Sequence, residues 1–159
     1  MREEIFRILK FLGLLIVIIV VEQFAKGMIR VEIEGDNEAM SPAFPPGKYR
    51  VIRNVRSADD LKPGDVVAYF PPGYPESAAV ARVVAIPGQE VELTGKELLV
   101  NGREFSFPGT RINPGKRKAP ATRVPQGCVF LLTDNPSGAI EMDRQGIVPV
   151  RCIWGRLRG

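Results

Sequence analysis

The chain has 159 residues, of which 45% are hydrophobic and 25% are charged, a composition typical of one globular domain with a short additional element. Its formal net charge of +4 is compatible with an anionic membrane surface or with nucleic acid and is diagnostic of neither. Because the chain contains no histidine, Ser-His catalysis, Cys-His catalysis and the common histidine-based metal sites are excluded.

An unbroken apolar run, Phe11 to Val21, lies near the N-terminus. A bilayer core needs roughly 20 residues of helix, and residues 5–24 reach that length if the charged groups at both ends extend to the interface. A cleaved secretory signal is the competing interpretation, but no small-x-small cleavage pattern directly follows the run. A buried core helix would need a polar face, which the run lacks. We therefore predict an uncleaved single-span anchor over residues 1–29, followed by a second domain over residues 30–159.

The second domain is predicted to consist of short strands separated by turns. Alternation with period two, or a short apolar run, predicts strands over residues 30–34, 49–55, 66–70, 78–86, 90–93, 97–100, 128–133 and 147–157. Asn101-Gly102 is typical of a type I′ hairpin turn. Residues 107–126 are rich in Pro, Gly, Lys and Arg and are predicted to form a mobile loop. Together these signals predict a compact all-β domain.

The two cysteines, Cys128 and Cys152, are far apart in sequence and form no C-x-x-C unit. We interpret them as small buried apolar residues on strands, and a disulfide remains the alternative. The basic run over residues 115–118 is interpreted as a solvated loop, with a lipid headgroup as the alternative partner. Because no aromatic interleaving accompanies this run, we expect no nucleic-acid partner. No residue pattern indicates a metal or a cofactor, so we expect neither.

Four segments behind the apolar run carry a pattern in a fixed order. They are Ala39-Met40-Ser41-Pro42-Ala43, Pro46-Gly47-Lys48, Ala81-Arg82-Val83-Val84-Ala85-Ile86-Pro87-Gly88-Gln89 with Val100-Asn101-Gly102 after it, and Thr133-Asp134-Asn135 through Gly146. Together they resemble the type I signal peptidases, whose boxes read Ser-Met-x-Pro, Gly-Asp, Lys-Arg-Val-x-Gly-Leu-Pro-Gly-Asp and Gly-Asp-Asn. The resemblance implies a mainly β fold: a single N-terminal transmembrane helix, then a compact β domain like those of signal peptidases and LexA, on the extracytoplasmic side of the membrane.

The resemblance also implies a catalytic mechanism that this chain lacks. In the family, a serine hydroxyl attacks the scissile carbonyl, a buried lysine amine accepts its proton, and a second serine orients the lysine. Carried over, these positions fall on Ala39, Ala81 and Ala139. A methyl group can neither attack nor accept a proton, so no catalytic residue is intact, and we predict a proteolytically inactive member. Ser41 adjoins the nucleophile position, but on a strand its hydroxyl would face away from the cleft.

Two other classes of function remain open. The chain could be a working serine endopeptidase that removes signal peptides, either through an unrecognised nucleophile or as the parent of an engineered Ser/Lys-to-Ala copy. Departures from the pattern at Ala43, Lys48 and Met142 favour natural degeneration, because disabling the dyad requires none of them. The third class is a scaffold that uses the fold without binding peptides.

A peptide-binding groove is implied even without the dyad. In the family, two strands pair with an extended substrate, and they correspond here to Asn37-Glu38-Ala39 and Ala78-Ala79-Val80. Predicted substrate-binding residues are therefore Asn37, Glu38, Met40, Ala78, Ala79 and Val80. Structural roles beside the site are predicted for Pro42, Arg82, Asp134 and Asn135. The expected partners are the lipid bilayer and either signal peptides of exported proteins or an active signal peptidase.

Overall fold

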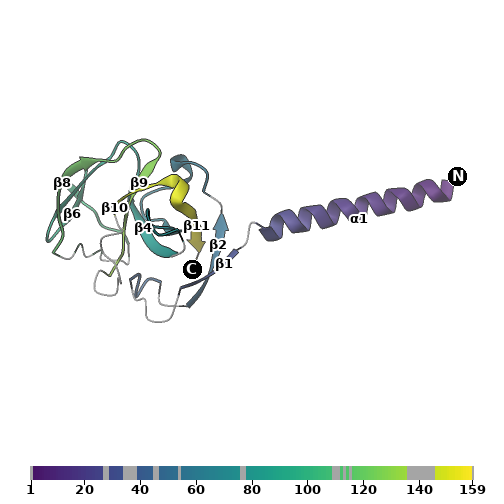
Figure 1. The fold of residues 1–159 in the computed structure, drawn as a ribbon, viewed down its shortest axis with the longest axis horizontal. Helices are drawn as coiled ribbons and strands as arrows, with labels where there is room; N and C mark the ends of the chain where they lie inside the picture. The colour runs from purple at the N-terminus through teal and green to yellow at the C-terminus, as the bar shows by residue number, and fades with distance from the viewer. Residues whose placement is uncertain are drawn as a thin grey trace.

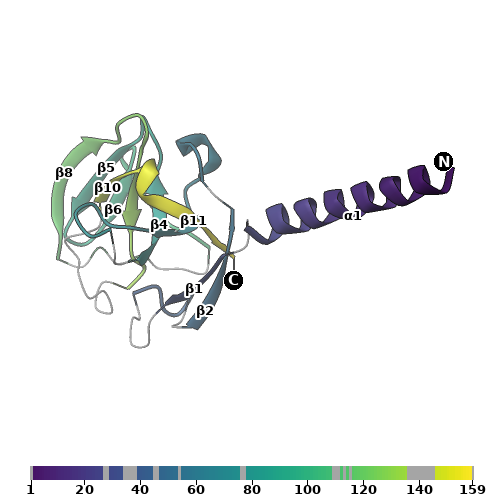
Figure 2. The ribbon, with the colours of Figure 1, turned by 45° about the vertical axis from the view of Figure 1, so that its right-hand side comes forward.

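The structure, a computed structural model, contains one N-terminal helix and a mainly β part (Figure 1). It describes residues 2–26, 29–33, 39–44, 47–53, 55–75, 78–108, 112, 114, 116–135 and 146–158. The helix is α1 (Arg2–Lys26). Figures 1 and 2 both show α1 projecting away from the β part as a separate rod.

The described chain after α1 is mainly β, as the sequence predicted, and contains two antiparallel sheets. The strands are β1 (Ile29–Ile33), β2 (Gly47–Arg53), β3 (Val66–Tyr69), β4 (Ala79–Ala85), β5 (Glu90–Thr94), β6 (Leu98–Val100), β7 (Arg103–Glu104), β8 (Lys118–Arg123), β9 (Cys128–Leu132), β10 (Gly146–Pro149) and β11 (Ile153–Arg158). Two 3₁₀ turns, η1 (Ala58–Asp60) and η4 (Val150–Cys152), interrupt them. The larger sheet has seven strands in the order β1-β2-β11-β3-β4-β9-β10, and the smaller has four in the order β7-β6-β5-β8.

Most predicted strands are present, with bounds that differ by one or two residues. The hairpin turn between β6 and β7 is also confirmed. Asn101 has φ 51° and Gly102 has φ 72°, the positive values that a type I′ turn requires at both central residues.

The predicted strand over residues 147–157 is wrong as a single element. β10 pairs with β9 at the edge of the larger sheet, whereas β11 pairs with both β2 and β3. The turn η4 separates them and is held by two hydrogen bonds to distant loops. The Val150 amide donates to the Gly127 carbonyl, and the Phe70 amide donates to the Cys152 carbonyl, each at 2.8 Å. Both bonds depend on tertiary contacts, and the one local signal of the break is Pro149, at which β10 ends.

The predicted mobile loop over residues 107–126 is wrong in part, because it contains the strand β8. This strand pairs with β5 in an antiparallel register that sets Glu90 opposite Arg123 and Thr94 opposite Lys118. β8 is an edge strand, and five of its six residues are exposed. Polar residues and proline are tolerated on such an edge, which explains why the composition of β8 is that of a loop.

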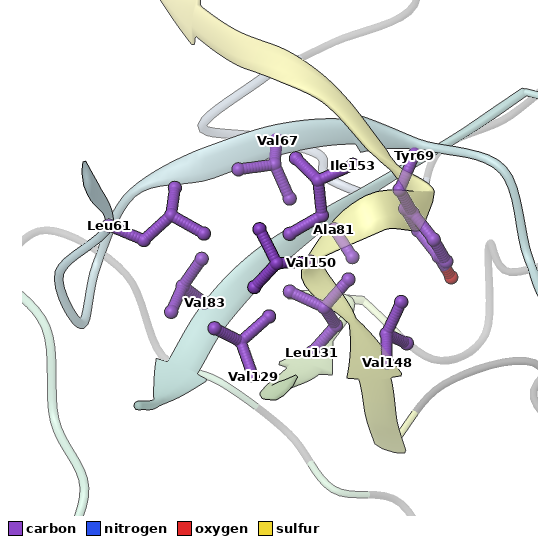
Figure 3. Close-up of a cluster of buried hydrophobic side chains, with 10 residues drawn as sticks. All are labelled: Leu61, Val67, Tyr69, Ala81, Val83, Val129, Leu131, Val148, Val150 and Ile153. Carbon is purple, nitrogen blue, oxygen red and sulfur yellow. The ribbon is translucent and has the colours of Figure 1, made fainter. Parts of the chain in front are cut away.

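Three clusters of buried apolar side chains form the core. The first cluster, drawn in Figure 3, consists of Leu61, Val67, Tyr69, Ala81, Val83, Val129, Leu131, Val148, Val150 and Ile153. The second cluster consists of Val84, Ala85, Val91, Leu93, Leu98, Val124, Phe130 and Leu132. The third cluster consists of Met40, Val66, Ala68, Val80 and Leu157. Successive residues at the centre of the larger sheet alternate between the first and third clusters, so both of its faces are covered.

Both cysteines are half-buried free thiols. Cys128 packs against the second cluster, and Cys152 packs against the first. The interpretation of the two residues as small buried groups on strands is confirmed in part: both pack against apolar clusters, but they are only half-buried and Cys152 lies in the turn η4; no disulfide joins them.

The helix α1 exposes apolar side chains along most of its length. Thirteen large apolar side chains between Phe6 and Val21 are 49–76% exposed. Within the part of the chain that the structure describes, no helix meets the combined length and apolarity that a membrane crossing requires. The predicted single-span anchor is therefore not confirmed.

Candidate functional site

The first of the four segments that carry the resemblance, residues 39–43, forms a turn in the structure. The Phe44 amide donates to the Met40 carbonyl at 2.7 Å, and residues 39–43 have turn geometry. The expectation that Ser41 faces away from the site is wrong in its reasoning, because residues 39 and 41 would share one face of a strand and here both lie in a turn. Ala39 and Met40 are almost completely buried, whereas Ser41 is half-buried.

The position that corresponds to the lysine base lies inside the core. Ala81 has no accessible surface and lies opposite Val67 in the pairing of β3 with β4. Figure 3 shows Ala81 among bulky members of the first cluster. The surroundings of its methyl group are apolar and closely packed.

In the described pairings, the first half of β4 has a partner strand on one side only, and Ala78 and Ala79 are its accessible residues. β4 pairs with β3 from Ala79 to Arg82, but the described pairing with β9 begins only at Arg82, opposite Leu132. In the described pairings, the segment Ala79–Ala81 therefore has a partner strand on one side only. Such an edge presents backbone N–H and C=O groups that an added strand can pair with.

The predicted substrate-binding residues divide between this edge and the core. Ala78 is exposed and Ala79 is half-buried, so both are accessible at the edge. Met40 and Val80 are buried together in the third cluster. Asn37 and Glu38 lie outside the described residues, as does Ala139.

A buried ion pair lies next to this half of β4. The Arg82 guanidinium donates through Nε and Nη2 to the two carboxylate oxygens of Asp134, at 2.8 and 2.5 Å. Both side chains are 2% exposed. The Arg82 Nη1 donates to the Gly64 carbonyl at 2.8 Å. This two-point geometry is the strong form of an arginine–carboxylate interaction, and it fixes the direction of both side chains.

The ion pair connects three of the four segments that carry the resemblance, namely those that contain Ala39, Arg82 and Asp134. The residue after Asp134 is Asn135, whose backbone amide donates to the Ala39 carbonyl at 2.8 Å. Arg82 directly follows Ala81, so covalent and hydrogen bonds link Ala81 to Ala39 through Arg82, Asp134 and Asn135. A path of covalent and hydrogen bonds thus connects the two alanines.

The ring of Phe107 covers the Arg82 guanidinium, and sequence reasoning missed this contact. The guanidinium carbon lies 4.8 Å from the ring centroid. The sequence analysis placed Phe107 in a mobile loop. A signal did exist, because Arg82 is the one charge in the apolar stretch 79–86 and a buried arginine needs partners. The sequence could not indicate which ring would supply one.

The chemistry available at this site is limited. Ala39 and Ala81 offer methyl groups, and Arg82 and Asp134 are committed to each other. Within the described part of the chain, no group of three or more His, Cys, Asp or Glu side chains could hold a metal ion. The backbone of the first half of β4 is the group best placed to bind a ligand.

Comparisons with known proteins agree with the pattern of the boxes. The sequence model of the family described as "Signal peptidase, peptidase S26" matches residues 5–158. The "Probable signal peptidase I-1" of Synechocystis sp. is 28% identical over 127 residues, covering 75% of this chain and 64% of that protein. The "Signal peptidase I" of Leptolyngbya laminosa is 29% identical over 129 residues, covering 76% and 63% respectively. The chain thus spans just under two thirds of the length of these two relatives.

Two further matches carry the same description. The "Signal peptidase I" of Bacillus caldolyticus is 23% identical over 138 residues, covering 77% of this chain and 74% of that protein. Among solved structures, a signal peptidase I from Enterococcus faecalis V583 matches with a TM-score of 0.46 at 21% identity. That match covers 62% of this chain and 97% of the solved chain.

Proposed function

Because the chain belongs to the signal peptidase family, peptidase S26, we propose that it is a non-cleaving member that binds exported peptides at the site of the lost dyad. The observation that carries the proposal is that, in the described pairings, the first half of β4 has a partner strand on one side only, with Ala78 and Ala79 accessible there. This edge provides backbone groups for an added strand, and the neighbouring side chains provide no nucleophile and no base.

Small side chains at the edge support an extended peptide as the ligand. An added strand gains affinity from main-chain hydrogen bonds, and its side chains alternate between the two faces of the sheet. At Ala78 and Ala79 the protein projects only methyl groups, which leave room for small side chains of a signal-peptide end. Met40 and Val80, which we predicted to touch substrate, support the edge from within the third cluster.

The absence of cleavage follows from the chemistry of the two described alanines. Acyl transfer from a peptide requires a group that attacks the carbonyl and a base that removes the proton of that group. A methyl group supplies neither function, and loss of either member of a dyad removes most of the rate. The protein is then a pseudoenzyme that binds peptides without cleaving them.

Strand addition predicts a specific pattern of binding by modified peptides. In an antiparallel ladder, alternate residues of the added strand point their N–H groups at the edge. We expect a synthetic signal-peptide analogue with a small-x-small end to bind saturably. N-methylation of one alternating set of its amides should weaken binding about tenfold or more, and methylation of the other set should not. Titration of the full chain with a fluorescent peptide measures this difference.

A matched pair of variants provides the control. Ala79→Trp should block the edge, whereas Ala119→Trp, at a half-buried alanine of the smaller sheet, should leave peptide binding unchanged. Cleavage of a preprotein by the wild-type chain, abolished by Ser41→Ala, would show instead a working peptidase with a different nucleophile. Absence of saturable peptide binding would leave only the scaffold function.

We also propose that α1 is a single-pass anchor that holds the β domain on the extracytoplasmic side of a membrane. The proposal is supported by the thirteen exposed apolar side chains between Phe6 and Val21. At 1.5 Å per residue, the predicted span of residues 5–24 is roughly 30 Å long, about the thickness of a hydrocarbon core, provided that its charged residues reach the interfaces. Arg7, Lys10 and Glu22 would then lie toward the two interfaces, where long charged side chains are tolerated.

Charges placed in the middle of α1 are expected to release the chain from membranes. Each arginine near the centre of a spanning helix costs about 2.5–3.5 kcal/mol on insertion scales, so Leu15→Arg/Ile18→Arg should abolish stable insertion. The measurement is resistance of the expressed chain to alkaline carbonate extraction. Arg7→Lys, which keeps the charge near the end of the helix, is the control. Complete extraction of the wild-type chain would contradict the anchor.

A further inference from the structure

We propose that Phe107 is a positioning residue for the peptide-binding site, which its ring supports through Arg82, Asp134 and Asn135. The segment between β7 and β8 supplies this ring from outside the larger sheet. The inference rests on the proposed function for its binding readout. The contacts themselves can be tested without any peptide.

The ring of Phe107 lies against two groups at once. It covers the Arg82 guanidinium, with 4.8 Å between the guanidinium carbon and the ring centroid. It also lies so close to Gly64 that a Cβ atom there would overlap the ring, at 2.7 Å from Cδ2. Gly64 has φ +100° and accepts a hydrogen bond from Arg82 through its carbonyl. The ring thus contacts both Gly64 and the Arg82 side chain that donates to the Gly64 carbonyl.

The guanidinium transmits this support to the first box. Its nitrogens are occupied by Asp134 and the Gly64 carbonyl, and its flat face is covered by the ring. A cation over an aromatic face is attracted by the ring quadrupole, and the attraction is larger when water is excluded. Loss of the ring would admit water to the ion pair, weaken its charge interaction, and loosen the Asn135 amide bond to the Ala39 carbonyl.

Phe107 differs from an ordinary core phenylalanine. Among the described residues it is neither a member of the three apolar clusters nor one of the hydrophobic residues packed against them. Phe105, two residues earlier, does pack against the second cluster. The main described contacts of the Phe107 ring are therefore a cation and a glycine, and Phe105 provides a matched control.

Hydrogen exchange of one amide tests the relay directly. In full-length chain, Phe107→Leu keeps apolar volume but removes the ring, and we expect the Asn135 amide to exchange about tenfold faster. The Val124 amide, bonded to the Gln89 carbonyl at 2.8 Å, should be unaffected and reports any global loss of stability. Phe107→Tyr should leave the Asn135 amide exchanging as slowly as in the wild-type chain, because it keeps an aromatic face over Arg82. Phe105→Leu should leave the Asn135 amide unchanged.

A second test reaches the same contact from the other side. Gly64→Ala should displace the ring and accelerate Asn135 exchange as Phe107→Leu does. Gly73→Ala is its control, because Gly73 also has a positive φ (+86°) but a Cβ there would meet nothing within 4 Å. The excess effect of Gly64→Ala over Gly73→Ala should disappear in a Phe107→Ala background. An excess that persists without the ring would count against the relay.

Peptide titration separates this inference from the proposed function. If the wild-type chain binds the signal-peptide analogue, Phe107→Leu should weaken that binding about tenfold while Phe105→Leu does not. Failure of the wild-type chain to bind peptide would refute the proposed function, and Asn135 exchange would still decide the role of Phe107. Unchanged Asn135 exchange in both Phe107→Leu and Gly64→Ala would overturn the inference, whatever the wild-type chain binds.

Discussion

Replacing Asp134 with asparagine is expected to lower the free energy of unfolding by about 3 kcal/mol or more. The substitution keeps the size of the side chain but leaves the Arg82 cation buried without a counter-charge. Arg82 is 2% exposed, so water cannot replace the lost partner. Denaturant titration followed by circular dichroism measures the change, with an unchanged denaturant slope as evidence that the native state is intact.

A second ion pair in the same domain provides the matched control. Asp65 lies 3.1 Å from Arg156, and the Arg156 side chain is 25% exposed. Asp65→Asn is expected to cost less than Asp134→Asn, because Arg156 stays in contact with water and keeps its hydrogen bond to the Asp60 carbonyl. Replacing both partners, as in Arg82→Met/Asp134→Leu, should recover much of the loss, since no buried charge remains. A double variant as unstable as Asp134→Asn would contradict the account based on an unpaired charge.

Introducing lysine at position 81 is expected to destabilise the fold and to leave the chain unable to cleave. Ala81 has no accessible surface and is surrounded by nine other members of the first cluster. An ammonium group and four methylenes would have to enter this packed apolar region, at a cost of about 3 kcal/mol or more. We expect Ala39→Ser/Ala81→Lys to show no turnover of a preprotein in detergent, because the lysine cannot settle beside the serine.

This experiment also distinguishes natural degeneration from an engineered knock-out. Ala39→Ser adds a single oxygen atom and should change stability little, and Ala79→Lys on the half-buried edge should cost under about 1 kcal/mol. A knocked-out copy of an active peptidase would keep the space that its lysine once filled. A stable Ala39→Ser/Ala81→Lys variant that cleaves a preprotein would therefore reverse our conclusion about the dyad.

Local signals in the sequence were sufficient for much of the fold. Period-two alternation and turn chemistry depend on neighbouring residues, so the strands and the Asn101-Gly102 turn were predicted close to their observed positions. The resemblance also singled out Arg82, Asp134 and Asn135, and in the structure Arg82 bonds to Asp134 while the Asn135 amide bonds to the Ala39 carbonyl. These residues were given structural roles, although the pairing between them was not stated.

The failures share one physical cause, which is dependence on distant partners. The turn η4 exists because Val150 and Cys152 bond to loops elsewhere in the chain. β8 becomes a strand because β5 offers an edge, although the composition of β8 is that of a loop. Phe107 follows β7 of the smaller sheet, whereas Arg82 lies on β4 of the larger sheet. No local pattern in the sequence indicates that these two residues are in contact.

The position of β11 has a consequence for how the chain folds during biosynthesis. β11 lies between β2 and β3 in the larger sheet, although it follows every other described strand in chain order. Among the described strands, β1 and β2 are thus joined to the rest of the sheet only through β11. The ribosome must therefore make the chain as far as Arg158 before these two strands can dock. Until then β3 presents an open, aggregation-prone edge, and the late long-range pairing makes closure slow.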